Sequence, residues 1–136
     1  MTLDNKTLLM AAGPNYAALT TLFKNGVPQT HVMWVDTDGE NILINTEIHR
    51  VKYKNVKIDP RVTVMIWKHD NPFKFVEIRG EVIGEITGKE ARDNIDKLSK
   101  KYWDKPYPFP IQTERIVLVI KPNKEVIFNL KDEDFQ

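Results

Sequence analysis

The sequence predicts an α+β fold with six or seven mostly antiparallel strands and two or three helices. Short apolar runs, several with a two-residue alternation, recur along the chain and are separated by turns such as Asn25-Gly26. Other segments carry helix start or stop signals instead. Two strand runs, at 62–67 and 115–120, are apolar on both faces. Such strands in an antiparallel protein indicate a closed barrel that is covered by helices or by a second subunit.

Length and composition are those of one ordinary globular domain, residues 1–136, with 41% hydrophobic and 29% charged residues. No apolar run is long enough to cross a membrane. A net charge of +1 gives no overall attraction to nucleic acid or to a membrane surface, so any anion site must be local. The chain has no cysteine and only three scattered histidines, which excludes disulfides and predicts no metal site.

The first residues do not have the features of a signal peptide. Their apolar stretch at 8–12 follows no basic segment and is interrupted by Gly13-Pro14. Together with the lack of cysteine, this pattern favours a cytoplasmic location.

The first half of the chain contains a short helix and three candidate strands. The helix is expected over about 4–12 and ends at Gly13-Pro14. Strands are expected over 17–24, 27–36 and 41–46, with turns at 25–26 and 37–39 between them. Three consecutive strands with such short turns predict an antiparallel meander.

A second helix is predicted over 48–58. Asn45 or Thr46 is expected to cap its start, and Asp59-Pro60 ends it because the residue before a proline is biased away from helix. Its buried stripe is expected to consist of Ile48, Val51, Asn55 and Ile58.

The second half of the chain predicts two more strands, over 62–68 and 73–85, followed by a helix. The residues Thr87 to Glu90 fit a capping box that opens this helix, which runs to about Tyr102. A final hairpin is expected to pair 114–121 with 125–130 through a turn at Pro122-Asn123. The core stripe of the helix is predicted to be Ala91, Ile95, Leu98 and Tyr102.

The segment at 45–61 carries the clearest chemistry. Four basic residues lie between positions 50 and 57, at the start of a helix that follows a strand. Helix N-termini present free N–H groups and a partial positive charge, and nearby Arg or Lys side chains strengthen phosphate binding there. Asn45 and Thr46 add neutral donors. Two interpretations follow, a phosphate-binding site or a solvated basic helix face.

The same segment resembles the split β-barrel flavin and deazaflavin oxidoreductases, the pyridoxamine-phosphate-oxidase-like superfamily. The family pattern N-T-x-x-x-R-x-K-x-x-N-[LV]-x-x-D-P-R-[VA] is similar to residues 45–62, and 26–34 are similar to the family's G-x-P-x-x-x-P-[VM]-W strand. Two positions depart from the family: Val32 stands where a proline is usual, and His49 where a small residue is common. The spacing R-x-K looks more like the branch that binds coenzyme F420 than like the FMN-dependent pyridoxamine phosphate oxidases.

The resemblance implies a split β-barrel homodimer with F420, or alternatively FMN, in a groove between the subunits. Arg50 and Lys52 would hold the cofactor's phosphate, and Thr46, with Asn45 beside it, would contact the phosphate or the ring edge. Met33 and Trp34 lie on the strand that borders the tricyclic ring.

Two further positions match the family pattern. Asn55 would either contact the cofactor or cap backbone groups. Lys54 stands where relatives carry Arg or Lys and is placed to meet the acidic tail of F420.

The implied activity is hydride transfer between the deazaflavin and a conjugated or unsaturated small molecule. The cofactor supplies this chemistry, so no nucleophile is needed and no catalytic side chain is singled out. A carrier of a cofactor or tetrapyrrole without turnover is the rival function, and a nucleic-acid partner is not expected.

A loop rich in proline and aromatic residues follows the last predicted helix, at 104–110. It either packs on the barrel or forms a wall of the substrate site, since binding residues favour loops on a rigid scaffold. Its aromatic residues, with those at the end of the helix, are Tyr102, Trp103, Tyr107 and Phe109.

Overall fold

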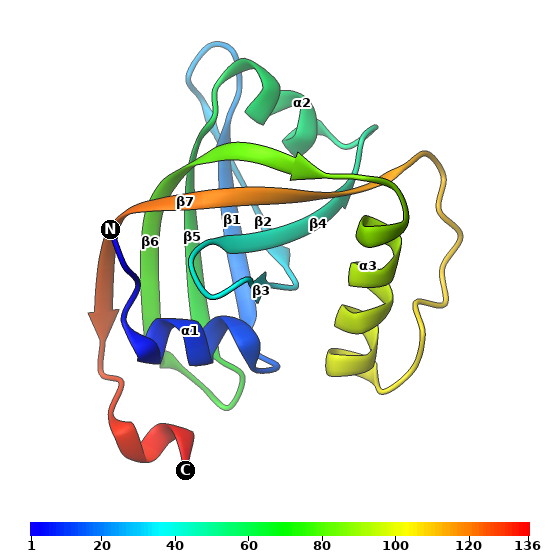
Figure 1. Ribbon diagram of the computed structural model, residues 1–136. Coiled ribbons are helices and arrows are strands. Elements are labelled where there is room, and N and C mark those ends of the chain that lie inside the picture. The colour runs from blue at the N-terminus through cyan, green and yellow to red at the C-terminus, as the bar shows by residue number, and fades with distance from the viewer.

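The structure, a computed structural model, describes all residues 1–136 and has the predicted α+β class (Figure 1). It contains seven strands, three α-helices and a short C-terminal 3-10 helix. In chain order these are α1 (Asn5–Ala12), β1 (Tyr16–Leu22), β2 (Pro28–Met33), β3 (Asp36–Thr37), β4 (Ile42–Glu47), α2 (Val51–Ile58), β5 (Arg61–Lys68), β6 (Asn71–Ile86), α3 (Gly88–Trp103), β7 (Arg115–Phe128) and η1 (Asp132–Phe135).

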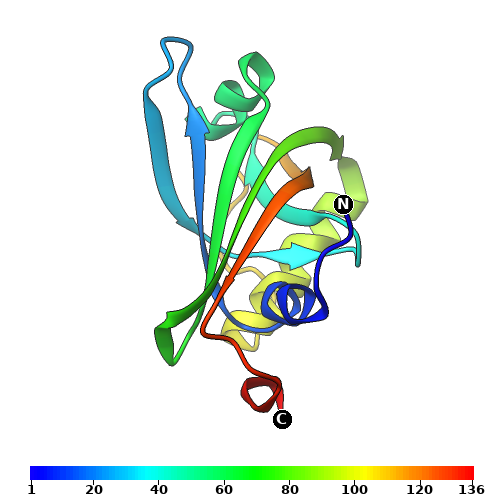
Figure 2. The ribbon, with the colours of Figure 1, turned by 90° about the vertical axis from the view of Figure 1, so that its left-hand side faces the viewer.

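All seven strands form one antiparallel sheet in the order β2-β1-β5-β6-β7-β4-β3. The sheet curls strongly but has two edges, β2 and β3, and is not closed (Figures 1 and 2). The split barrel is therefore confirmed, whereas the closed barrel expected from the doubly apolar strands is wrong. Helix α3 covers the second face of β7 and also packs against β4, whereas the second face of β5, with Thr63, Met65 and Trp67, is only half-buried.

The predicted meander forms both of its turns, but its middle strand is broken into β2 and β3. The β1–β2 hairpin forms around Asn25-Gly26, where Gly26 has a φ of 87°. The strand at 42–47, however, does not pair with β2. It pairs with β7 and with the two-residue β3, at the other end of the sheet. The break at 34–35 between β2 and β3 allows the chain to pass from one edge to the other.

The predicted C-terminal hairpin is also wrong, because β7 is one continuous strand. Its first part pairs with 80–86 and its last part with 75–79, all within β6. The register shifts at Arg79/Gly80, where both strands bend, and Pro122 lies opposite Gly80 at this shift. Proline is tolerated at position 122 because the register shift leaves no ladder hydrogen bond that would need its missing backbone N–H. Any Cβ at position 80 would overlap the carbonyl oxygen of Lys121, so glycine permits the close approach of the strands.

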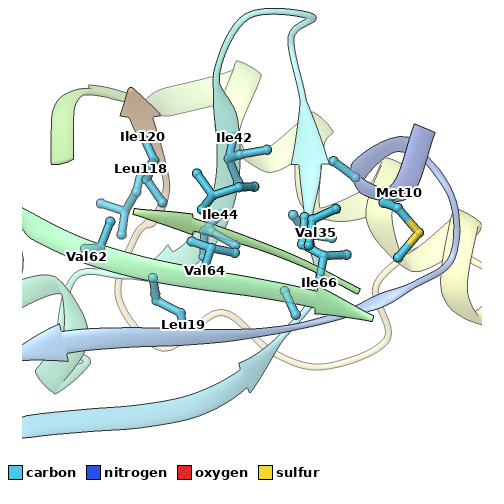
Figure 3. Packing of buried hydrophobic residues seen from close by; sticks show 14 of the residues in the cluster. Met10, Leu19, Val35, Ile42, Ile44, Val62, Val64, Ile66, Leu118 and Ile120 are labelled. Carbon is cyan, nitrogen blue, oxygen red and sulfur yellow. The ribbon is translucent and has the colours of Figure 1, made fainter. Parts of the chain in front are cut away.

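The main core fills the concave side of the curled sheet (Figure 3). Leu19, Val64, Ile44 and Leu118 come from four different strands and are buried there. Every residue of β4 is buried, because the core covers one face of the strand and α3 covers the other. The carboxyl end of β4, which leads into α2, is thereby held rigidly.

The basic helix α2 is shorter than predicted, and only part of the predicted stripe is buried: Asn55 is buried, and Ile48 packs half-buried against the core. Its N-cap is Arg50, and no side chain caps it, so the expected cap by Asn45 or Thr46 is wrong. Asp59 ends the helix as predicted. Val51 and Ile58 are 44% and 60% exposed, whereas Lys52, Asn55 and Val56 are buried. The helix packs against β1, which turns this polar face inward.

Helix α3 matches its prediction closely in length and in its buried stripe. Ala91, Ile95 and Leu98 are buried, and Tyr102 is half-buried. Its N-cap Thr87 makes no side-chain capping bond, so the predicted capping box does not form. No helix of the structure combines the length and apolar character that crossing a membrane requires.

Candidate functional site

A groove of about 520 Å³ lies where β2, the end of β4 and the start of α2 meet. We call it the cationic groove. It brings together a mostly polar set from distant parts of the chain: Thr30, His31, Val32 and Met33 of β2, Asn45 and Thr46 of β4, Arg50 and Lys52 of α2, and Arg115 of β7.

Two cations in this groove have no partner within the protein. Neither Arg50 nor Lys52 makes a side-chain hydrogen bond or an ion pair, although the chain has many of both. Lys52 is only 8% exposed, and its burial, with the nearby charge of Arg50, lowers its pKa. The first N–H groups of α2 lie at the same place and have no helical acceptors. An anion in the groove would offset the repulsion between Arg50 and Lys52 and would accept hydrogen bonds from the free donors.

A second cavity, of about 280 Å³, adjoins the groove, and we call it the aromatic pocket. Trp34 stacks on Tyr102 at 5.1 Å between ring centroids and meets Trp103 edge-on at 4.5 Å. Tyr107 and Phe109 continue this wall on the loop after α3. The pocket is lined by Tyr16, Val32, Met33, Trp34, Asn45, Ile95, Leu98, Trp103, Tyr107, Phe109 and Arg115.

The groove and the pocket are neighbours, because four residues, Val32, Met33, Asn45 and Arg115, line both. Arg115 is the first residue of β7 and lies at the junction. Its Nη2 donates to the Tyr107 hydroxyl at 2.6 Å, and its carbon Cζ lies 4.7 Å from the centre of the Tyr107 ring. Sequence reasoning missed Arg115, because it lies between a polar loop and an apolar strand, belongs to no motif and is 70 residues from Asn45.

The loop that carries the aromatic wall is tied down at both ends. The buried carboxylate of Glu47 accepts the backbone N–H groups of Gln112 and Thr113 at 2.8 and 2.9 Å. Burial opposes ionisation of Glu47, but these hydrogen bonds outweigh it and lower its pKa. Asp96 of α3 accepts the backbone N–H of Tyr107. The loop is therefore a fixed wall of the aromatic pocket.

The predicted cofactor-binding residues separate into two groups. Asn45, Thr46, Arg50, Lys52 and Met33 line the cationic groove, and Trp34 lines the aromatic pocket with Met33 and Asn45.

Asn55 and Lys54 lie outside both cavities. The side chain of Asn55 is buried and donates to the Thr21 hydroxyl at 3.0 Å, which ties α2 to β1. Lys54 is exposed on the outer face of α2.

Comparisons with known proteins agree with this architecture. A family model described as pyridoxamine 5'-phosphate oxidase matches residues 5–126, so the chain belongs to this family. The resemblance noted in the sequence is thus confirmed. A comparison with curated protein sequences gives no significant match.

Several solved structures share the fold. One, an F420 reductase, is 28% identical with a TM-score of 0.78, over 91% of this chain and 98% of the other. General Stress Protein 26 from Bacillus anthracis is 14% identical with a TM-score of 0.69, over 93% of each chain. A pyridoxamine 5'-phosphate oxidase-related, FMN binding protein from Nostoc punctiforme is 11% identical with a TM-score of 0.59, over 82% of this chain and 72% of the other. Fold and family thus define the class of pyridoxamine 5'-phosphate oxidase-like split barrels.

The residues of the site fit a cofactor of this class. The unpaired Arg50 and Lys52 offer charge to a phosphate, and the adjoining aromatic wall offers apolar faces to a planar ring. A donor set of two unpaired cations and free helix N–H groups suits an anion better than a metal, and no cluster of metal-binding side chains exists.

Proposed function

We propose that the protein is an F420-dependent oxidoreductase that transfers a hydride between the deazaflavin and a conjugated or unsaturated small molecule. One observation carries the proposal: the unpaired cations Arg50 and Lys52 lie in a groove that shares four of its lining residues with an aromatic pocket. The similarity to an F420 reductase supports the choice of cofactor.

In this proposal each part of the site has a separate task. Arg50, Lys52 and Thr46 bind the phosphate, with Asn45 beside them, and Met33 and Trp34 border the ring. When bound, the reduced deazaflavin supplies a hydride to the acceptor. The apolar wall around Trp34 excludes water from the reacting atoms. No side chain is assigned as proton donor, since solvent can supply the proton.

Lys54 is proposed to act outside the groove. It lies one helical turn after Arg50 on the exposed side of α2, where a flexible acidic tail can reach it. Asn55, by contrast, is proposed to act structurally through its bond to Thr21.

We also propose that the working form is a homodimer, with a second copy covering the open side of the site. Residues at this side are apolar and yet exposed: Val32 is 66%, Phe109 55% and Trp103 45% exposed. Large exposed apolar groups next to a cavity are typical of an interface. Each subunit would act as a single domain of residues 1–136 in the cytoplasm.

FMN is the second candidate cofactor. It would present its phosphate to the same cations, and the fold is shared with an FMN binding protein from Nostoc punctiforme. A carrier without turnover would use the same site.

Titration of the protein with F420 and with FMN, followed by cofactor fluorescence, tests the proposal. We expect tight, salt-sensitive binding of F420 and weaker binding of FMN. Arg50→Ala/Lys52→Ala should weaken binding at least tenfold, since each charge-assisted contact contributes about 1.5–3 kcal/mol. The matched control is Lys24→Ala/Lys124→Ala, which removes two exposed lysines without partners.

Three results would contradict parts of the proposal. Equal affinity of the Arg50/Lys52 double variant and its control would refute the phosphate assignment. Preference for FMN would replace the cofactor. Tight binding of reduced F420 without its oxidation across a broad set of acceptors would favour the carrier.

A further inference from the structure

Arg115 is a buried cation whose hydrogen-bonding capacity the protein does not fill. Its side chain is 10% exposed. Of its five N–H donors, one bonds the Tyr107 hydroxyl at 2.6 Å and one reaches Asn45 Oδ1 at 3.4 Å. Its Nε is buried without any partner. Glu47 Oε2 is 3.9 Å from Nη2, beyond hydrogen-bond distance.

Glu47 balances the charge of this cation as a buried ion pair, but it accepts no hydrogen bond from the guanidinium. Its other oxygen, Oε1, is occupied by the backbone N–H groups of Gln112 and Thr113, which hold the carboxylate toward the loop. A guanidinium buried with few partners costs free energy, and an apolar side chain would fill the position better. Such an under-bonded buried group calls for a reason other than stability.

The surroundings of Arg115 indicate what it binds. Nine of the eleven residues of the aromatic pocket are hydrophobic, and the other two are Asn45 and Arg115. Asn45 is already used, because its Nδ2 donates to the Ala91 carbonyl and to Asn94, and its Oδ1 faces Arg115. Arg115 is therefore the one charged group lining this pocket, and it has donors to spare.

We propose that the aromatic pocket binds a planar conjugated carboxylate and that Arg115 receives its carboxylate group. The planar, forked guanidinium matches a carboxylate, while the rings of Trp103 and Phe109 pack against the conjugated part and Trp34 is left to the cofactor ring. A volume of about 280 Å³ admits one or two rings. Arg115 thereby selects acids over neutral analogues, and Arg50 and Lys52 remain free for a phosphate.

The role of this ligand as hydride acceptor rests on the proposed function, but its binding does not. The test therefore uses the protein without added cofactor. Cinnamate serves as the acid and cinnamamide as its neutral analogue, and binding is followed by isothermal titration calorimetry and tryptophan fluorescence. We expect cinnamate to bind at least tenfold more tightly than cinnamamide.

Variants assign this preference to the guanidinium. Arg115→Gln should weaken cinnamate binding about 10- to 150-fold and leave cinnamamide nearly unchanged. Arg115→Lys should restore part of the preference. Tyr107→Phe keeps the guanidinium and removes its best partner, so it should keep the preference for the acid. Arg79→Gln, on the exposed face of β6, is the matched control.

Equal binding of cinnamate and cinnamamide to the unmodified protein would overturn the proposal. A preference for cinnamate that survives Arg115→Gln would also overturn it. So would a preference that Tyr107→Phe abolishes as fully as Arg115→Gln, because the preference would then depend on the loop and not on the guanidinium. If Arg50→Ala/Lys52→Ala abolishes the preference for cinnamate but Arg115→Gln does not, the carboxylate binds in the cationic groove and the proposal is wrong.

The same variants separate this proposal from the proposed function. If F420 and FMN both fail to bind while cinnamate binds through Arg115, the proposed function is wrong and the carboxylate site stands. If F420 binds and turns over but cinnamate shows no dependence on Arg115, only the carboxylate site is wrong. Circular dichroism and the thermal midpoint confirm that each variant is folded.

Discussion

Replacing Lys52 by methionine tests whether this residue is kept for binding rather than for stability. Lys52 is 8% exposed, lies beside Arg50 and makes no hydrogen bond or ion pair. Methionine has a similar length and flexibility without the charge, so it fills the same space without leaving a broken contact. Burial and the charge of Arg50 already lower the pKa of Lys52, which means that its charged form is disfavoured in the free protein.

The two expected effects of Lys52→Met have opposite signs. The free energy of unfolding of the free protein should stay the same or increase, because an unpaired and partly desolvated charge is removed. Affinity for the phosphate-bearing cofactor should fall by about 10- to 150-fold, the equivalent of one charge-assisted contact of about 1.5–3 kcal/mol. Combined with Arg50→Ala the losses should not add fully, because the two cations face the same groove.

The effect should also depend on pH. The pKa of Lys52 is lowered in the free protein, and a bound anion favours its charged form, so cofactor affinity should fall as the pH rises through the lowered pKa. Lys52→Met should lack that part of the pH dependence.

Two measurements check these expectations. Urea denaturation of the cofactor-free protein gives stability, and fluorescence titration from pH 7 upward gives affinity. Lys124→Met is the control, an exposed lysine without partners. The reasoning is refuted if Lys52→Met lowers stability by more than the control, or if it binds the cofactor as tightly as the control.

Three further predictions concern the scaffold. Gly80→Ala should lower the free energy of unfolding by about 1–3 kcal/mol because its Cβ overlaps a carbonyl, whereas Gly84→Ala, which meets open space, should change it by less than about 0.5 kcal/mol; equal denaturation curves would contradict this. Asn55→Ala should cost about 1–3 kcal/mol of stability and leave cofactor affinity within about twofold, and a large loss of affinity would restore its binding role. Burial lowers the pKa of Lys101 to about 8 from 10.5, so the unfolded chain binds more protons between these values. The stability of the protein relative to Lys101→Met should therefore rise between pH 8 and 10, and a flat difference in urea midpoints would rule out the shift.

Local signals in the sequence located most elements correctly. The turn at Asn25-Gly26, the stop at Asp59-Pro60 and the stripe of α3 depend on backbone preferences and periodicity within a few residues. The errors occurred where a local signal competes with pairing partners elsewhere in the chain. Pro122-Asn123 is typical of a turn, but β6 offers a continuous partner on both sides of it, and the chain bends there instead.

For helix α2, local sequence signals also failed to predict the whole of the buried face. Its periodicity favoured a stripe of Ile48, Val51, Asn55 and Ile58, of which Asn55 is buried whereas Val51 and Ile58 are exposed. Packing of this short helix is decided by β1 and by the groove, which turn Lys52 and Asn55 inward. A buried lysine at a ligand site carries no periodicity that distinguishes it from a surface lysine.

The sequence by itself determined the class of fold, the family and the basic segment at 45–61 that forms one end of the site. These follow from residue order, because turns, alternation and a helix-initial basic motif are properties of neighbouring residues. Only the tertiary structure decided that the sheet stays open, that Asn55 is used within the scaffold, and that Arg115 joins the cationic groove to the aromatic pocket. Arg115 meets Asn45 because β7 pairs with β4 across 70 residues of chain, and such a long-range pairing is selected by the packing of the whole sheet.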